Sequence, residues 1–253
     1  MMESSLAGDL RDQVKRFPIV GPALHSLYLR AFRREGELML IQNGRLKGRR
    51  WLRLMRTHND EYVSGAYEES VQDCLASVLT TDQVFYDIDA NVGFFSLLAA
   101  TIVGCHGRVV SIEPHPLTAG QLVRQMRVNG YDATVLKVAL SDYEGTGTFD
   151  DSAPSVMASL KANTDGPTIT VPVTTLDNIS KSFRTPDVIK IDVEGEELQV
   201  LDGARHLLEE HHPTLIVELH SSAIVHAYNQ KLEQLGYRTV PISDRTVLSI
   251  FHA

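Results

Sequence analysis

The sequence predicts an α/β protein whose open, doubly wound and mostly parallel sheet is closed by a C-terminal antiparallel hairpin. From Val84 onward, short apolar segments alternate with segments of helical spacing, a pattern typical of a parallel sheet with helical crossovers. Segments such as VVSIEP and TLIVEL are almost continuously apolar, as expected when helices cover both faces of the sheet. The last two apolar segments, RTVPIS and TVLSIFH, are joined only by Asp244 and Arg245, so they must pair antiparallel.

The expected elements follow one another along the chain. Residues 9–34 have the apolar spacing of a helix interrupted by two prolines, residues 44–55 suit a hairpin or a loop, and residues 58–80 suit a turn followed by a helix. Further strands are expected at 84–88, 108–114, 133–140, 168–176, 187–195, 214–220, 238–243 and 246–252, and further helices at 94–103, 117–130, 196–211 and 223–237. We therefore expect a mostly helical N-terminal extension at residues 1–60 and an α/β domain at residues 61–253.

Composition narrows the class of protein and its partners. The 253 residues are 43% hydrophobic and 22% charged, which is ordinary for a soluble globular protein, and no apolar run approaches the ~20 residues that cross a bilayer. Cys74 and Cys105 are the only cysteines, which favours a reducing, cytoplasmic location over a disulfide framework. Residues 1–60 hold 12 Lys and Arg against 6 Asp and Glu, whereas residues 61–253 hold 12 against 26. The acidic domain disfavours a nucleic-acid substrate, and the basic arm either packs on that domain or contacts an anionic partner such as a membrane surface.

Polar residues gather where the predicted parallel strands end. In open α/β sheets the ligand binds outside these carboxyl ends, near the switch in strand order. The positions concerned are 87–93, 113–115, 140–142, 192–197 and 218–221. Glu113 is suited to accept hydrogen bonds from ribose hydroxyls, Leu140 and Asp142 are suited to an adenine base, and the N–H groups of residues 91–94 suit an anionic group. Taken singly, each carboxylate is also explained as a helix N-cap.

Several longer motifs resemble one known family. They are YVSGAYEESV, FYDIDANVGFFSLLAA, RVVSIEPHP, VALSD, VTTLDNI and, above all, the long and specific IKIDVEGEELQVLDGA. Together they cover roughly residues 62–220 and resemble the FkbM-type family of S-adenosylmethionine-dependent methyltransferases, within the seven-strand methyltransferase class. The closing hairpin fits the same class.

The resemblance implies a Rossmann-like sheet of seven strands, S-adenosyl-L-methionine as the cofactor, and methyl transfer to a substrate heteroatom, most often a hydroxyl oxygen. Family substrates include sugars, polyketide products and other secondary metabolites, so the implied partner is a small-molecule or glycan acceptor. The implied cofactor-binding residues are Asp87, Asp89, Ala90, Asn91, Gly93, Phe94, Glu113, Pro114, Leu140, Ser141 and Asp142. The implied substrate pocket contains Tyr67, Glu68 and Lys190, and the segment 143–170 is expected to face the acceptor.

Methyl transfer to a hydroxyl requires a group that removes the proton, since the methyl donor is already activated and the protein mainly aligns the acceptor. Candidates for this general base are Asp192, Glu194 and His220. Asp192 comes first because its strand abuts the switch in strand order, and His220 second because an imidazole titrates in the useful range. His220 is equally well explained as a capped histidine at a strand end. No His, Asp or Glu spacing resembles a metal site, so no obligatory metal is expected.

The turn after the first strand of the domain leaves alternatives open. A nicotinamide-dependent oxidoreductase needs G-x-G-x-x-G, whereas D-I-D-A-N-V-G has one glycine and an acid where the phosphates would lie. Asp89 occupies a position that is glycine in the family, and a left-handed aspartate costs on the order of 1–2 kcal/mol. A catalytically impaired relative is therefore the alternative function. Asp89 would favour binding beside the cofactor's ammonium and oppose it beside the carboxylate, and the sequence does not distinguish these positions.

Overall fold

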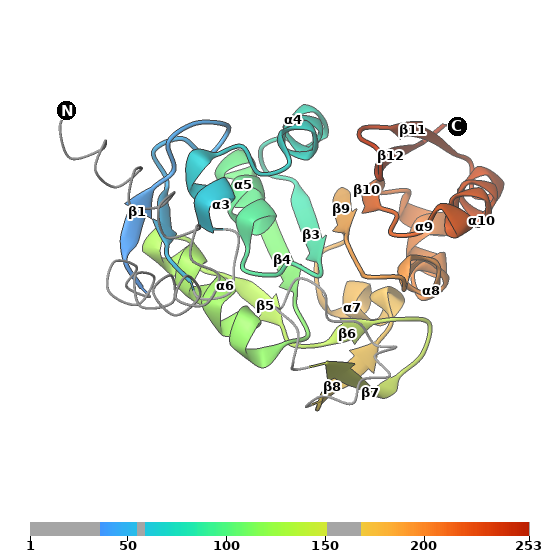
Figure 1. The fold of residues 1–253 in the computed structure, drawn as a ribbon. Helices are drawn as coiled ribbons and strands as arrows, with labels where there is room; N and C mark the ends of the chain where they lie inside the picture. Colours follow the sequence, from blue (N-terminus) through green and yellow to red (C-terminus); the bar gives the residue numbers. More distant parts are fainter. Residues whose placement is uncertain (1–35, 55–58, 151–167, 253) are drawn as a thin grey trace, which may run out of the picture.

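A computed structural model describes residues 36–54, 59–150 and 168–252 of the chain (Figure 1). Its centre is a seven-stranded sheet with the order β11-β12-β10-β9-β3-β4-β5. The strands are β3 (Val84–Ile88), β4 (Arg108–Ile112), β5 (Thr134–Leu136), β9 (Val188–Ile191), β10 (Thr214–Glu218), β11 (Tyr237–Pro241) and β12 (Thr246–Phe251). All neighbours pair in parallel except β12, which runs antiparallel to β10 and β11. The predicted doubly wound sheet and its closing hairpin are confirmed, while the helix expected at residues 9–34 lies outside the described residues.

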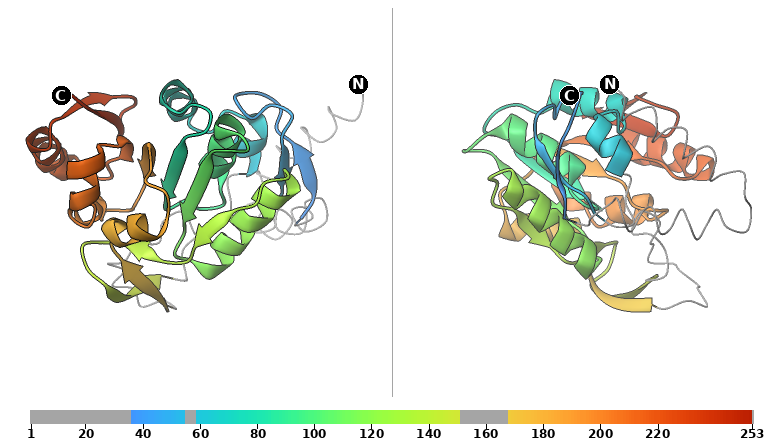
Figure 2. Two further views of the ribbon diagram at one scale, coloured as in Figure 1. Left: turned by 180° about the vertical axis from the view of Figure 1, so that it is seen from behind. Right: turned by 60° about the vertical axis from the view of Figure 1, so that its left-hand side comes forward.

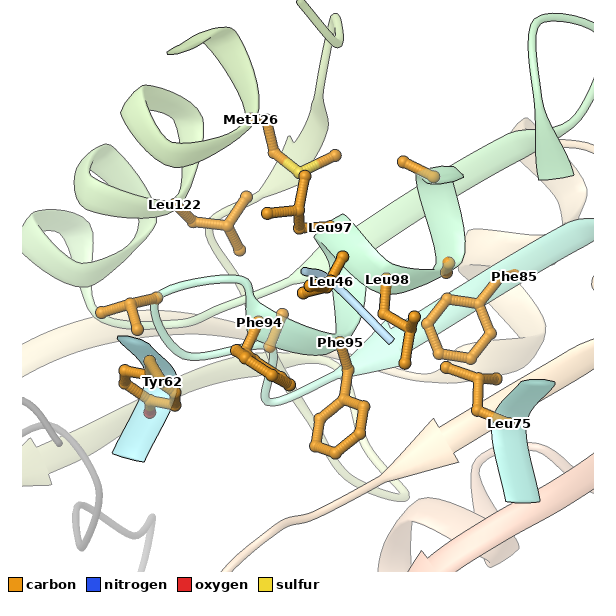
Figure 3. Close-up of a cluster of buried hydrophobic side chains, with 14 of the residues drawn as sticks. Leu46, Tyr62, Leu75, Phe85, Phe94, Phe95, Leu97, Leu98, Leu122 and Met126 are labelled. Carbon is orange, nitrogen blue, oxygen red and sulfur yellow. The ribbon is translucent and has the colours of Figure 1, made fainter. Parts of the chain in front are cut away.

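Helices cover both faces of this sheet (Figures 1 and 2). The first face carries α3 (Asn59–Ser64), α4 (Glu69–Val78), α5 (Phe94–Val103) and α6 (Pro116–Val128), and the second carries α7 (Leu176–Ser182), α8 (Glu197–Asp202), α9 (Arg205–His211) and α10 (Ser222–Gln234). Alternation along β3 sends Phe85 into the first core and Tyr86 into the second. Figure 3 shows the first core, in which Phe94 of α5 lies near Tyr62 of α3 and Phe95 lies on the other side of Phe94. Burial of each such side chain contributes roughly 1.5–3 kcal/mol relative to exposure.

Two predicted elements are divided in the structure. The strand expected at residues 133–140 splits into β5 and β6 (Ala139–Leu140), and β6 joins a second sheet with β7 (Gly145–Asp150) and β8 (Thr168–Thr174), ordered β6-β8-β7. The strand expected at 168–176 therefore lies outside the central sheet. The helix expected at 196–211 is two helices, which are separated by Gly203 and Ala204. Gly203 packs so closely on Ser141 that a Cβ would lie 2.1 Å from its carbonyl oxygen. The side chain of Asp177 then accepts the backbone N–H groups of His206 and Leu207 at the start of α9.

Residues 36–54 pack as part of the first core. β1 (Leu38–Leu40) pairs antiparallel with β2 (Arg50–Leu52), so the described part of the segment expected at 44–55 belongs to a hairpin, and Trp51 is fully buried. The outer edge of β2 is bound by α6. The Gln125 amide accepts from Leu52 N and donates to Leu52 O, both at 2.8 Å, and the Asn129 amide pairs with the backbone of Arg50 at 2.9 and 2.8 Å. The domain boundary at residues 60 and 61 stays a prediction. Among the described residues, none of the helices combines the length and apolar character that crossing a membrane requires.

Candidate active site

A cavity of about 220 Å³ opens where β3, β9 and β10 end. The register places Lys190 of β9 beside Asp87 of β3 and Ile216 of β10, which brings the carboxyl ends of these three parallel strands together. Eleven of the predicted site residues line the cavity: Tyr67, Glu68, Asp87, Asp89, Ala90, Asn91, Phe94, Lys190, Asp192, Glu194 and His220. The rest of its lining was not assigned a role from sequence and consists of Glu61, Tyr62, Val92, Phe95, Glu218 and Arg245.

The turn after β3 contains three residues in the left-handed region, Asp89 (φ 58°), Asn91 (φ 48°) and Gly93 (φ 90°). Gly93 is required because a Cβ there would lie 2.7 Å from Leu122 Cγ. Asn91 N donates to Glu113 Oε2, and Gly93 N donates to the carbonyl of Ala90. The expectation that residues 91–94 offer free N–H groups to an anion is therefore wrong for Asn91 and Gly93, because the protein itself uses these donors.

Glu113 is a buried carboxylate at the end of β4. Its two oxygens accept the backbone N–H groups of Asn91 and His115, each at 2.9 Å. Burial raises the pKa of Glu113 to about 8, against the opposing effect of these two hydrogen bonds, and the charge of Asp87 adds to the increase. Glu113 does not itself line the cavity, but it lies close enough to Asp89 to raise the pKa of that carboxyl.

Asp87 and Lys190 form the floor of the cavity. Asp87 accepts a 2.6 Å hydrogen bond from Ser96 Oγ, and its Oδ1 is buried without a hydrogen-bond partner in the described part of the chain. Lys190 Nζ lies 2.7 Å from Asp192 Oδ2 and 4.9 Å from the centroid of the Phe95 ring. Burial lowers the pKa of Lys190, but the charges of Asp192 and Asp87 outweigh it and leave the pKa above its usual value. Lys190 therefore remains charged, and the Asp87 oxygen remains available to a further donor.

His220 follows β10 and points its ring into the cavity. Nδ1 lies 2.8 Å from Glu197 Oε1, while Nε2 lies 3.6 Å from Asp192 Oδ1 and 3.5 Å from Glu194 Oε2. Burial lowers the pKa of His220, but the bond to Glu197 and the surrounding carboxylates raise it further, so the net shift is upward. The three candidate bases that the sequence predicted thus lie together. The role of Glu197, a residue of the VEGEE segment, was not predicted from the sequence, because its partner His220 is 23 residues away.

The cavity is strongly acidic. Seven carboxylate residues line it, against two cationic side chains among the described residues, Lys190 and Arg245. Asp89 lies among these carboxylates. Burial raises its pKa most, the charges of Glu113 and Asp192 raise it further, and the charge of Lys190 offsets only part of this increase. A bound positive charge would relieve this repulsion.

A second, smaller cavity of about 30 Å³ adjoins the first, and Asp89 and Glu194 line both. Its other walls are mostly apolar and consist of Ile88, Ile112, Pro114, Val138, Ala139, Leu140, Phe149, Val193 and Glu196. The predicted residues Pro114 and Leu140 are therefore in place. Ser141 is buried beside Glu196, with its Oγ 3.3 Å from Oε2, and Asp142 is exposed; neither lines a cavity, and the adenine contact expected of Asp142 stays a prediction.

Tyr67 and Glu68 lie just before α4 and not within it. Glu68 is in the left-handed conformation (φ 46°) and precedes the first helical residue, Glu69. The Tyr67 ring contacts those of Tyr62 and Phe94, with centroids 4.6 and 5.2 Å away. These rings form an aromatic wall of the cavity. Of the acceptor-facing segment expected at 143–170, the structure describes β7 and the start of β8, which place Phe149 in the smaller cavity.

One group of residues within 36–54, 59–150 and 168–252 has the spacing of a metal site. Asp192, Glu218 and His220 each bring one donor atom within 4.8 Å of the others. The grouping spans two strands, which is why sequence spacing did not reveal it. Glu218 Oε1 is already paired with Arg245 at 2.6 Å, and Asp192 with Lys190. The expectation of no obligatory metal stays a prediction.

The strand order 5-4-3-9-10-12-11, with an antiparallel β12 and an acid-lined cavity at the carboxyl ends, defines the seven-strand class of S-adenosylmethionine-dependent methyltransferases. Residues 87–239 match the model of the methyltransferase FkbM domain, and the chain belongs to that family.

Two relatives extend this assignment. The hexuronic acid methyltransferase AglP of Haloferax volcanii is 28% identical over 156 residues, which cover 61% of this chain and 63% of that protein. The structure of a methyltransferase FkbM from Methylobacillus flagellatus superimposes with a TM-score of 0.50 and 19% identity, covering 78% of this chain and 56% of that one. At this identity the structural likeness concerns the fold alone. In both comparisons the chain spans less than two thirds of the relative.

Proposed function

We propose that this protein transfers a methyl group from S-adenosyl-L-methionine to an oxygen atom of a sugar that carries a carboxylate. The observation that carries the proposal is the acidic cavity at the ends of β3, β9 and β10, which joins a small apolar cavity at Asp89. The first suits the positively charged part of the cofactor together with the acceptor. The second contributes apolar walls of the kind that pack on an adenine base.

The residues present fit this cofactor. It carries an ammonium and a sulfonium against one carboxylate, so the excess of carboxylates around the cavity favours it. The buried Oδ1 of Asp87 has no hydrogen-bond partner in the described part of the chain and is suited to accept from the ammonium. Asp89 would face the cationic part. Glu113, expected from the sequence at the ribose hydroxyls, lines neither cavity, and its two oxygens hold the backbone N–H groups of Asn91 and His115.

When bound, the cofactor supplies a methyl group that its sulfonium activates. The chain's own task is to orient the acceptor and take its proton. We assign proton removal to His220, because Nε2 faces the cavity and Nδ1 is held by Glu197. Asp192, which the sequence favoured, is the less suitable base because Lys190 occupies its Oδ2. It remains placed to orient the acceptor hydroxyl.

Two observations support an acidic sugar as the acceptor: the activity of one relative and the position of one arginine. AglP is a hexuronic acid methyltransferase, and a hexuronic acid brings a negative charge to a cavity that is already acidic. Lys190 is buried and paired with Asp192, whereas Arg245 pairs with Glu218 at 2.6 Å through one nitrogen and, with its side chain 63% exposed at the rim, keeps further N–H donors of the guanidinium. Arg245 is therefore suited to bind the acceptor's carboxylate, and the rings of Tyr62 and Tyr67 are suited to pack on a sugar.

Calorimetric titration with S-adenosyl-L-methionine, followed by a methyl-transfer assay on para-nitrophenyl glucuronide and on the matching glucoside, tests this function. We expect micromolar binding by the wild type, and transfer to the glucuronide in preference to the glucoside. The variant Asp89→Gly tests the alternative that the protein is catalytically impaired, an alternative that the left-handed conformation of Asp89 favours. Binding by that variant and none by the wild type would refute the proposal.

A further inference from the structure

Glu197, the first residue of α8, has no role in the cofactor or acceptor contacts proposed above, yet it is fully buried. Its Oε1 lies 2.8 Å from His220 Nδ1 and also accepts the backbone N–H of His220 at 3.1 Å. Its Oε2 is buried without a hydrogen-bond partner in the described part of the chain. One carboxylate oxygen therefore fixes both the backbone and the ring of His220.

The ionised form of Glu197 is favoured where it lies. Burial acts to raise the pKa of Glu197, but the hydrogen bonds from the His220 ring and backbone reverse this effect and leave the pKa below its usual value. An ionised carboxylate only accepts hydrogen bonds, so Nδ1 must carry the proton. The ring then presents Nε2 with its lone pair, or with a second proton, to the cavity.

The other groups around the ring do not provide this constraint. Asp192, Glu194 and Glu218 approach Nε2 at 3.6, 3.5 and 3.8 Å, and Arg245 lies behind Glu218. These distances exceed those of hydrogen bonds, so the three carboxylates act on the ring through their charge and do not fix its orientation. Glu197 is the single short contact to the imidazole among the described residues.

We propose that Glu197 is a positioning residue, which holds the His220 ring with the proton on Nδ1 and Nε2 directed at the acceptor. This inference rests on the proposed function, in which His220 takes the acceptor proton. The carboxylate also stabilises the imidazolium that forms once Nε2 has accepted that proton. A histidine held through its second nitrogen by a buried acid is a recurrent arrangement in proteins that use the first nitrogen for chemistry or binding.

The test compares Glu197→Gln, which keeps the shape, with Glu197→Ala and with Glu209→Gln as a matched control on the exposed side of α9. Nitrogen NMR of the His220 ring in the cofactor-free protein reads the tautomer without any turnover. At a pH above the raised pKa of His220, where the ring is neutral, we expect the Nδ1–H form in the wild type and the control, and a mixture of tautomers in Glu197→Ala. In the methyl-transfer assay on para-nitrophenyl glucuronide, Glu197→Gln should lower kcat about 10- to 100-fold. Its Kd for S-adenosyl-L-methionine should change less than about threefold, and the acidic limb of its pH–rate profile should move to lower pH.

An unchanged tautomer in both Glu197 variants, or a kcat for Glu197→Gln within about twofold of the wild type, overturns the inference. Failure of the wild type to bind the cofactor or to methylate sinks the proposed function instead, and the NMR comparison still decides the role of Glu197. Because the glutamine is isosteric, its result stands even where the alanine variant does not fold.

Discussion

Buried carboxylates at the proposed cofactor site should make the cofactor-free protein less stable as the pH rises through neutrality. Folding raises the pKa of Glu113 from 4.5 to about 8, mainly by burial. Between these values the folded protein keeps a proton that the unfolded chain has lost, so the free energy of unfolding falls with increasing pH. The raised pKa of His220 acts with the same sign, because the stability it contributes is present at low pH and is lost as the pH rises through its folded value.

The magnitude follows from Glu113 alone. One group contributes at most about 1.4 kcal/mol per pH unit, so the free energy of unfolding should fall roughly 2–3 kcal/mol between about pH 5.5 and about pH 7.5. Urea denaturation should show this as a midpoint lower by roughly 1 M. Glu113→Gln, which cannot ionise, should be less stable at the lower pH because it loses an acceptor for one of the two backbone N–H groups, yet its stability should depend less on pH. Stability that is constant or rises over this interval in the wild type would refute the reasoning.

Three further predictions concern binding and turnover. Arg245→Gln should raise the KM for para-nitrophenyl glucuronide about 5- to 50-fold while changing that for the glucoside little, because only the first carries a carboxylate; an equal effect on both would remove Arg245 from acceptor recognition. Asp192→Asn should lower kcat about 10- to 100-fold and leave the Kd for the cofactor nearly unchanged, measured by calorimetry, and retained turnover would remove Asp192 from acceptor orientation. Dialysis against EDTA should leave the transfer rate unchanged, and a loss that Mg²⁺ or Mn²⁺ restores would assign a metal to Asp192, Glu218 and His220.

The central sheet was predictable because strands buried on both faces are nearly continuous in apolar residues. β3 and β10 show this pattern, and both occur at the expected positions. The second sheet was not predictable, because nothing in the segment at 168–176 distinguishes a strand of the central sheet from one that pairs with β7. The close packing of Gly203 on Ser141 was not predictable either, because the two residues are distant in sequence.

The site residues also divide into those that the sequence could place and those that it could not. Asp87, Asp192 and His220 could be placed because they lie toward the carboxyl ends of predicted strands, and these ends meet at one edge of the sheet. The contact of Glu197 with His220 could not be predicted, because it depends on how α8 packs against the end of β10. Asp142 also follows a strand, but that strand belongs to the second sheet and leaves the side chain exposed.

Two amide side chains, one in α6 and one at its C-cap, give β2 a substitute for a neighbouring strand. Gln125 and Asn129 are four residues apart, one helical turn, and each engages both the N–H and the C=O of alternate residues of β2. The edge that would otherwise template a strand from another molecule is thereby closed. Replacing both amides with alanine would leave a short open edge on β2, whose hairpin partner β1 exposes Leu38 and Leu40, and such an edge favours pairing with a strand of another molecule.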